Sequence, residues 1–122
     1  MEHYYHFFDD FNNEHNILME YMGGGSIEDL IRKNKANETR MDETTAKIFI
    51  RQVLLGLEYL HCIKSIIHRD IKPANLLIAE TQELKISDFG ESKYLNEGEN
   101  TIKGTPMYMA PEIIDVLFSV SL

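Results

Sequence analysis

The residues best suited to chemistry lie in one polar loop between two short apolar runs. Within six positions the loop holds a carboxylate, an ammonium and a carboxamide, at Asp70, Lys72 and Asn75. The β-branched pair Ile66–Ile67 precedes the loop, and the aliphatic run Leu76–Ile78 follows it. Apolar runs bounded by polar residues predict short strands, so we expect a catalytic-type loop held between two strands.

Two further motifs follow along the chain. Asp88-Phe89-Gly90 begins thirteen positions after Asn75, and Ala110-Pro111-Glu112 comes later. Together with His68-Arg69-Asp70, they resemble the catalytic loop, the magnesium loop and the end of the activation segment of eukaryotic protein kinases. A lone tripeptide recurs by chance, whereas several motifs in order at fixed offsets are specific. The resemblance covers the chain from about residue 4 to residue 112.

The resemblance implies a role for each polar group in phosphoryl transfer, which depends on positioning and charge neutralisation. Asp70 would be the base that orients the substrate hydroxyl and accepts its proton. Lys72 would offset negative charge on the transferred phosphoryl group. Asn75 and Asp88 would hold magnesium, which prefers hard oxygen ligands. The implied cofactors are therefore ATP and Mg2+.

The resemblance also implies a nucleotide pocket. Met19 would be the gatekeeper at the back of the adenine site, and Glu20, Tyr21 and Met22 would form the hinge whose backbone binds adenine. Leu77 would form the floor under the adenine ring. Any hairpin could look the same from sequence alone, so this assignment depends on the downstream motifs.

Three residues are implied in regulation and substrate choice. Arg69 would pair with a phosphate on the activation segment, because a guanidinium binds phosphate in bidentate fashion. Thr101 matches the usual phosphorylation position, with an ordinary exposed threonine as the alternative. Thr105, together with Lys72, favours serine or threonine over tyrosine as the residue phosphorylated. Glu91 follows the magnesium loop, where the family more often has a small or apolar residue, and the sequence assigns it no role.

The elements that must position these groups follow from local patterns. The expected strands are 4–8, 16–22, 66–67, 76–78 and 84–87, with the last two paired as a hairpin. The triple glycine 23–25 is expected to be a flexible joint. Ser26 with Asp29 forms a capping pair that predicts a helix from Ile27 to about Lys33.

A longer helix is expected from Asp42, which can cap it, to His61. Its apolar residues recur every three or four positions and predict one continuous buried face, formed by Ala46, Ile50, Val53, Leu57 and Leu60 and widened by Phe49 and Leu54. Gly56 lies within this helix and suggests a close contact with another helix. His68 and Phe89 are expected to be structural, stacked with a contribution from Tyr4 in an apolar column.

Composition limits the setting and the partners. The chain has 122 residues, enough for one domain, and a formal net charge of -8, which argues against nucleic-acid and anionic-membrane partners. Its single cysteine, Cys62, permits no internal disulfide, and no apolar run reaches the roughly 20 residues of a membrane span. The single cysteine fits a cytosolic or nuclear setting, and a cytoplasmic location is expected. The resemblance to protein kinases implies protein substrates and an upstream kinase that activates the chain.

The predicted fold is α+β, as a partial kinase-like fold. Residues 1–22 would be the last small-lobe strands and the hinge, 23–112 the first part of the large lobe, and 113–122 an atypical tail. We find no glycine-rich phosphate loop or strand lysine in the sequence, so a fragment with little activity of its own is expected.

Three functions stay open at this point. The sequence favours a piece of a serine/threonine kinase that resembles kinases of mitogen-activated cascades. A catalytically dead, kinase-like regulatory module is the second hypothesis. An unrelated helical protein that matches the motifs by chance is the third.

Overall fold

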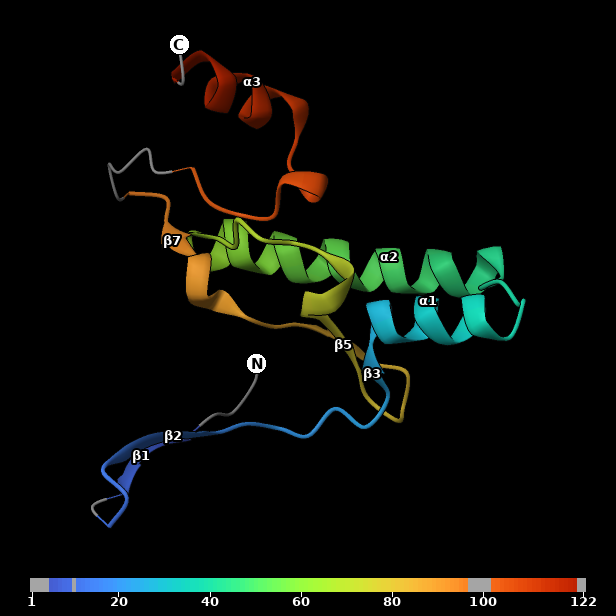
Figure 1. The fold of residues 1–122 in the computed structure, drawn as a ribbon, viewed down its shortest axis with the longest axis horizontal. Coiled ribbons are helices and arrows are strands. Elements are labelled where there is room, and N and C mark those ends of the chain that lie inside the picture. Colours follow the sequence, from blue (N-terminus) through green and yellow to red (C-terminus); the bar gives the residue numbers. More distant parts are fainter. Residues whose placement is uncertain (1–4, 10, 97–101, 121–122) are drawn as a thin grey trace.

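The computed structural model describes residues 5–9, 11–96 and 102–120. Helices and small antiparallel sheets alternate along the chain, which confirms the predicted α+β class (Figure 1). The strands are β1 Tyr5–Asp9, β2 Glu14–Leu18, β3 Gly25–Ser26, β4 Ile66–Ile67, β5 Leu76–Ile78, β6 Leu84–Ile86 and β7 Lys93–Tyr94. The α-helices are α1 Ile27–Ala36, α2 Glu43–Glu58 and α3 Pro111–Val120. No helix of the described ranges is long and apolar enough to cross a membrane.

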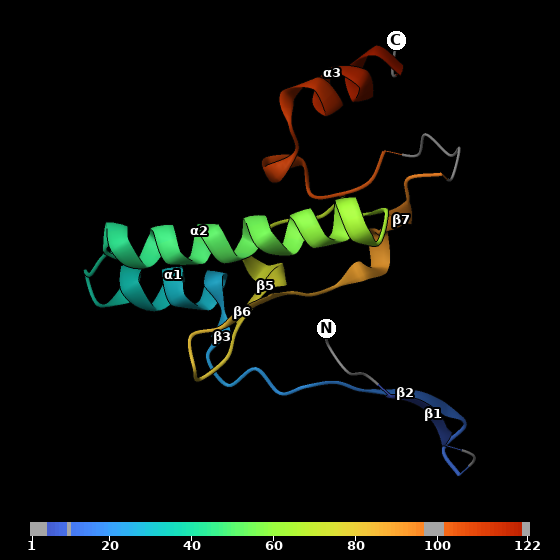
Figure 2. The same cartoon turned by 180° about the vertical axis from the view of Figure 1, so that it is seen from behind.

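The first two strands form an antiparallel hairpin that projects from the rest of the molecule, as Figures 1 and 2 both show. Its register pairs Tyr5 with Leu18 and Asp9 with Glu14. The second strand ends four residues earlier than predicted, at Leu18 rather than Met22, and Leu18 pairs with Tyr5, the first described residue of β1. The segment between β2 and β3 therefore runs extended outside any sheet.

The predicted capping pair of α1 is confirmed. Asp29 N–H donates to the hydroxyl of Ser26 at 3.1 Å, and Ser26 N–H donates back to the Asp29 carboxylate at 3.0 Å. The helix runs one turn further than predicted, to Ala36, with Lys33 and Lys35 in its last turn, where the helix dipole favours cations.

The glycine run before α1 is packed, and the prediction of a flexible joint was wrong. Gly24 N–H donates to the carbonyl of Ile78 at 2.8 Å, next to the β3–β5 ladder. A Cβ on Gly24 would lie 2.6 Å from that carbonyl oxygen. The glycine is needed because the two backbones approach closely.

Helix α2 is capped by Asp42, as predicted, and continues as a π-helical turn over Tyr59–Ile63. The predicted buried face is only partly right. Phe49 is 7% exposed, whereas Ile50 is 59% exposed, because the partner sheet of α2 meets the Phe49 side of the helix. Gly56 does allow a close contact, but with Ile86 of strand β6 rather than with another helix.

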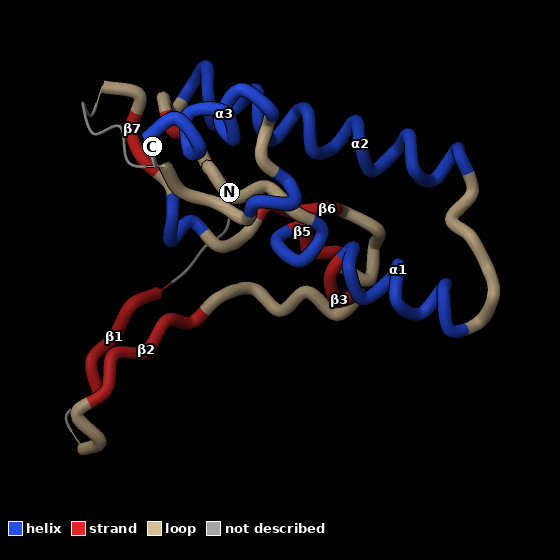
Figure 3. Tube along the Cα trace, turned by 45° about the horizontal axis from the view of Figure 1, so that its top comes forward, coloured by secondary structure: helices blue, strands red, loops and turns tan. Residues whose placement is uncertain are grey.

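The core lies where α2 packs on the β5–β6 hairpin. Phe49, Ile78 and Leu84 are buried together, and Leu30 and Val53 pack against them. The two strands form an antiparallel hairpin, as predicted, and its register places Leu76 opposite Ile86. A second short ladder, β4 with β7, was not predicted and joins the chain before the polar loop to the chain after residue 91 (Figure 3). These pairings hold both ends of the polar loop.

Candidate functional site

The polar loop lies between β4 and a 3-10 turn, Pro73–Asn75, that leads into β5. Three of its polar side chains are buried: His68 is 1%, Asp70 8% and Asn75 6% exposed. Burying such groups is costly unless each is hydrogen-bonded. The contacts of these three side chains therefore define the site.

The buried His68 side chain bonds to the backbone of the polar loop and to the backbone of Ser87. Its Nδ1 accepts a hydrogen bond from the backbone N–H of Asp70 at 3.3 Å, so the proton of the neutral ring lies on Nε2. That Nε2 lies 2.9 Å from the carbonyl of Ser87, to which it donates. The ring also meets Phe89 edge-on, with centroids 4.9 Å apart. The stacking of His68 with Phe89 agrees with the predicted structural role, and the third predicted member, Tyr4, lies outside the described residues.

Asp70, Lys72 and Thr105 form a closed hydrogen-bonded ring. Thr105 Oγ1 donates to Asp70 Oδ1 at 2.7 Å, and Lys72 Nζ lies 2.6 Å from Asp70 Oδ2. Lys72 Nζ also donates to Thr105 Oγ1 at 2.9 Å. The ring joins the polar loop to a residue 35 positions later in the chain, so the end of the activation segment lies on the predicted base.

The ring keeps both charges at neutral pH. The hydrogen bond from Lys72, followed by the one from Thr105, lowers the pKa of Asp70, and both effects outweigh the opposing effect of burial. The bond to Asp70 in turn raises the pKa of Lys72. Asp70 is therefore an anion and Lys72 a cation at pH 7.

Asn75 lies directly against Asp70. Its Nδ2 donates to the Asp70 carbonyl at 2.9 Å and to the Asp70 carboxylate at 3.2 Å. The carbonyl of Asn75 accepts from the backbone N–H of Ser87 at 2.9 Å. Because Asp88 follows Ser87, this pairing places Asp88 at the Asn75 end of the hairpin.

Asp88 is exposed and adopts a left-handed backbone, with φ 63°. Its Oδ1 accepts from Gly90 N–H at 3.3 Å. Arg69, in the polar loop, is also left-handed, with φ 68°. Such a conformation costs about 1–3 kcal/mol at a non-glycine residue and is concentrated at functional sites. Asp88 itself and Arg69, the neighbour of Asp70 in the chain, are thus the two strained residues of the site.

Most of the predicted nucleotide-binding residues are more exposed than His68, Asp70 and Asn75. Met22 is buried, while Met19 and Tyr21 are 64% and 87% exposed. The carboxylate of Glu20 is paired with Lys85 Nζ of strand β6, which ties the extended hinge segment to the hairpin. Leu77 is half-buried and pairs with Ser26 across the β3–β5 ladder.

Arg69, one of the predicted regulatory residues, bonds to the chain just after the Asp88-Phe89-Gly90 motif. Its Nε donates to the backbone carbonyl of Glu91, and the carboxylate of Glu91 lies 3.2 Å from Lys103 Nζ. The sequence did not predict this contact of Lys103; the unusual acid after Gly90, Glu91, was the signal that could have indicated it. Thr101, the predicted phosphorylation position, lies outside the described residues.

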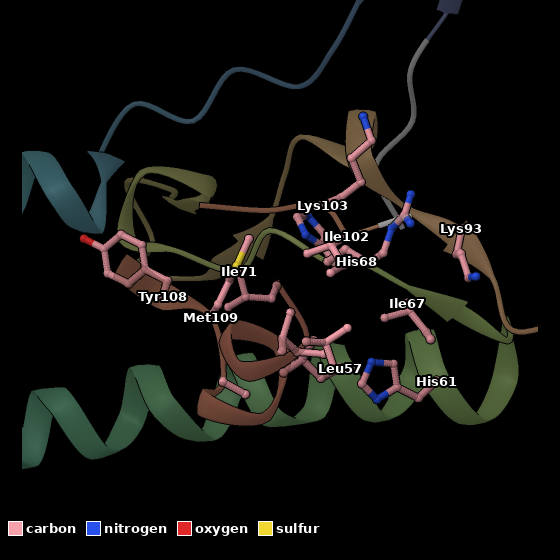
Figure 4. Close-up of a pocket in the computed structure, with 14 residues that line it drawn as sticks. Leu57, His61, Ile67, His68, Ile71, Lys93, Ile102, Lys103, Tyr108 and Met109 are labelled. Atoms are coloured by element: carbon pink, nitrogen blue, oxygen red, sulfur yellow. The ribbon is translucent and has the colours of Figure 1, made fainter. Parts of the chain in front are cut away.

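A cavity of about 670 Å³ lies beside Arg69 (Figure 4). Side chains of α2, such as Leu57 and His61, form one wall. Ile67 of β4, Ile71 of the polar loop and Met109 also line it. Asp70 and the hinge residues are not among the residues that line this cavity, whereas His68 and Arg69 of the polar loop are.

Known proteins are similar to this chain in sequence. The family described as "Protein kinase domain" matches residues 2–119. Mitogen-activated protein kinase kinase 1c of Physcomitrium patens is 46% identical over 99 residues, which cover 79% of this chain and 28% of the relative. Mitogen-activated protein kinase kinase SIPKK of Nicotiana tabacum is 46% identical over 114 residues, covering 91% of this chain and 30% of the relative. The chain thus spans less than a third of either relative.

Proposed function

The chain belongs to the protein kinase family, and on that premise we propose that it is part of a serine/threonine kinase. The reaction is transfer of the γ-phosphate of ATP to serine or threonine hydroxyls of protein substrates. The observation that carries this proposal is the ring in which Lys72 and Thr105 both bond to the buried carboxylate of Asp70.

Asp70 acts mainly by orientation. A carboxylate has about four lone-pair positions, and Thr105, Lys72 and Asn75 occupy three of them. The fourth can accept the hydrogen bond of a substrate hydroxyl. Because its pKa is lowered, Asp70 is a weak base that accepts the proton late, as the new oxygen–phosphorus bond forms and the bond to the ADP leaving group breaks. Lys72 offsets negative charge beside the transferred group.

The side chains present fit Mg2+ and the ATP phosphates. Both hydrogen bonds of the Asn75 carboxamide to Asp70 run through Nδ2, so Oδ1 takes part in neither. Asp88 is exposed and bonds to Gly90 through Oδ1. Mg2+ is commonly bound by one or two carboxylates plus substrate phosphates, and Asp88 would supply the carboxylate and Asn75 the amide oxygen of such a site. When bound, that ion supplies neutralisation of phosphate charge.

The remaining assignments extend the same proposal. Met19 to Met22 and Leu77 form the adenine site, and Arg69 binds a phosphate that an upstream kinase places on Thr101. The relatives named for mitogen-activated cascades favour a place in a signalling cascade. A cytoplasmic location suits the free and exposed thiol of Cys62. The tail boundary after residue 112 stays a prediction.

Phosphate incorporation tests the proposal. The chain is expressed with the coding sequence that flanks it and is incubated with radiolabelled ATP, Mg2+ and a protein substrate. We expect label on serine and threonine, and a loss of about a hundredfold or more in Asp70→Asn, which cannot accept the proton.

Glu43→Gln is the matched control, because Glu43 forms only an exposed ion pair on α2. Label that persists undiminished in Asp70→Asn would refute the assignment of the base. A stable protein that incorporates no label would favour the regulatory-module hypothesis instead.

A further inference from the structure

Glu91 contacts two different parts of the site. Its backbone carbonyl accepts the hydrogen bond from Arg69 Nε, so the residue is held on the polar loop. Its carboxylate Oε2 lies 3.2 Å from Lys103 Nζ, twelve positions further along the chain. The start of the activation segment is therefore joined both to the loop and to the end of the same segment.

The end of the segment returns to Arg69 by a second route. Gly104 follows Lys103 and has φ 119°, a conformation that side chains rarely adopt. A Cβ there would lie 2.4 Å from the carbonyl oxygen of Arg69. Arg69 thus contacts Glu91 with its side chain and Gly104 with its backbone. The ion pair between Glu91 and Lys103, the residue before Gly104, links these two contacts directly.

These contacts lead to the hydrogen-bonded ring of Asp70, Lys72 and Thr105. Thr105 follows Gly104 and donates to Asp70 Oδ1 at 2.7 Å. It also starts the turn in which Tyr108 N–H donates to the Thr105 carbonyl at 2.9 Å. A displacement of Lys103 and Gly104 would carry Thr105 with them, because only one peptide unit separates Thr105 from Gly104.

We propose that Glu91 is a positioning residue, which holds Thr105 on Asp70 by pairing its carboxylate with Lys103. This inference rests on the proposed function for the meaning of Thr105. The pair is 45% and 41% exposed at its two side chains, so its effect is modest and weakens with salt. Figure 4 shows Ile102 and Lys103 among the side chains that line the neighbouring cavity.

Amide hydrogen exchange at Tyr108 and the methyl NMR signal of Thr105 test the proposal, without nucleotide or substrate. In Glu91→Gln and Lys103→Gln we expect exchange about 1.4- to fivefold faster at Tyr108, the range of an exposed ion pair, and a shifted Thr105 methyl signal. The charge-swapped double variant, Glu91→Lys with Lys103→Glu, restores both to near the original values. High salt should speed exchange of the Tyr108 amide in the unsubstituted chain and should not change it in Glu91→Gln.

Glu43→Gln is the matched control, since it removes the same charge from an exposed ion pair on α2, where Glu43 lies 2.6 Å from Lys47. Unchanged exchange in Glu91→Gln, an equal change in Glu43→Gln, or no restoration by the charge swap would each overturn the proposal. Slow exchange in α2 verifies that each variant is folded. If exchange at Tyr108 depends on Glu91 but the protein transfers no phosphate, the positioning role holds and the proposed function is refuted. If the protein transfers phosphate but exchange does not depend on Glu91, the proposed function holds and the positioning role is refuted.

Discussion

Asp70 shows how a buried carboxylate keeps its charge. Burial alone would raise its pKa, but the hydrogen bonds from Lys72 and Thr105 lower it. The folded-state pKa therefore lies below the unfolded-state value. The stabilisation that this charge contributes is fully present above the unfolded-state pKa, near 4, and is lost as the pH falls through the lowered value.

Thr105→Val should raise the pKa of Asp70, because it removes the second largest of the effects that lower it. Carbon-detected NMR titration of the Asp70 carboxyl measures the change. Stability is lost as the pH falls through the folded-state pKa of Asp70, which is higher in the variant. On acidification, Thr105→Val should therefore begin to lose stability at a higher pH than the unsubstituted chain.

Thr45→Val provides the control for the titration. Thr45 Oγ1 donates to Asp42 Oδ2 at 2.6 Å, a bond of the same kind at the start of α2. That variant should raise the pKa of Asp42, which the Thr45 side chain lowers most, and leave Asp70 alone. If Thr105→Val leaves the Asp70 titration unchanged, the ring does not control its charge.

At the scale of elements, the short β3–β5 ladder fixes where α1 begins. Gly24 and Gly25 bring the chain against Ile78, and Ser26 then caps the helix. The two helices α1 and α2 run beside one another in both ribbon views (Figures 1 and 2), with an apolar groove of about 440 Å³ lined by residues of both. The position of α1 therefore depends on the glycine contact.

Gly24→Ala should destabilise the fold by about 1–3 kcal/mol, the usual cost of overpacking, because its Cβ would meet the Ile78 carbonyl at 2.6 Å. Gly23→Ala is the matched control. Its Cβ would meet only the side chain of Glu80, at 2.8 Å, and that side chain can rotate away. Urea unfolding of both variants measures the difference, and equal midpoints would contradict the packed role of Gly24.

At the scale of the whole molecule, the core is small and much apolar surface faces solvent. Phe49, Ile78 and Leu84 form the buried cluster, whereas Ile50 and Leu54 on α2 are 59% and 60% exposed. Both exposed residues line the groove beside α1. Exposed apolar patches of this kind promote association.

Ile50→Glu should reduce self-association of the chain without unfolding it, because its side chain is already largely exposed. Ile48→Glu is the matched control: Ile48 is 53% exposed, lies on the same helix and does not line the groove. Sedimentation velocity measures the oligomeric state. An equal reduction in both variants would show that added charge, rather than the groove, controls association.

Local patterns in the sequence determined the capping of α1 by Ser26 and Asp29, the start of α2 at Asp42 and the β5–β6 hairpin. Each depends on residues close in the chain, so composition and spacing suffice. The order of the motifs around Asp70, Asp88 and Glu112 likewise determined the family. The end of β2 was missed because strand length depends on a pairing partner.

Only the tertiary structure decided the contacts between distant segments. The bond from Thr105 to Asp70 spans 35 positions, and the pairing of β4 with β7 brings Glu91 to Arg69. Likewise, Phe49 rather than Ile50 became the centre of the core once the sheet covered one side of α2. Spacing along the chain predicts which residues share a face or a turn, whereas packing between elements decides which face is covered and which charges meet.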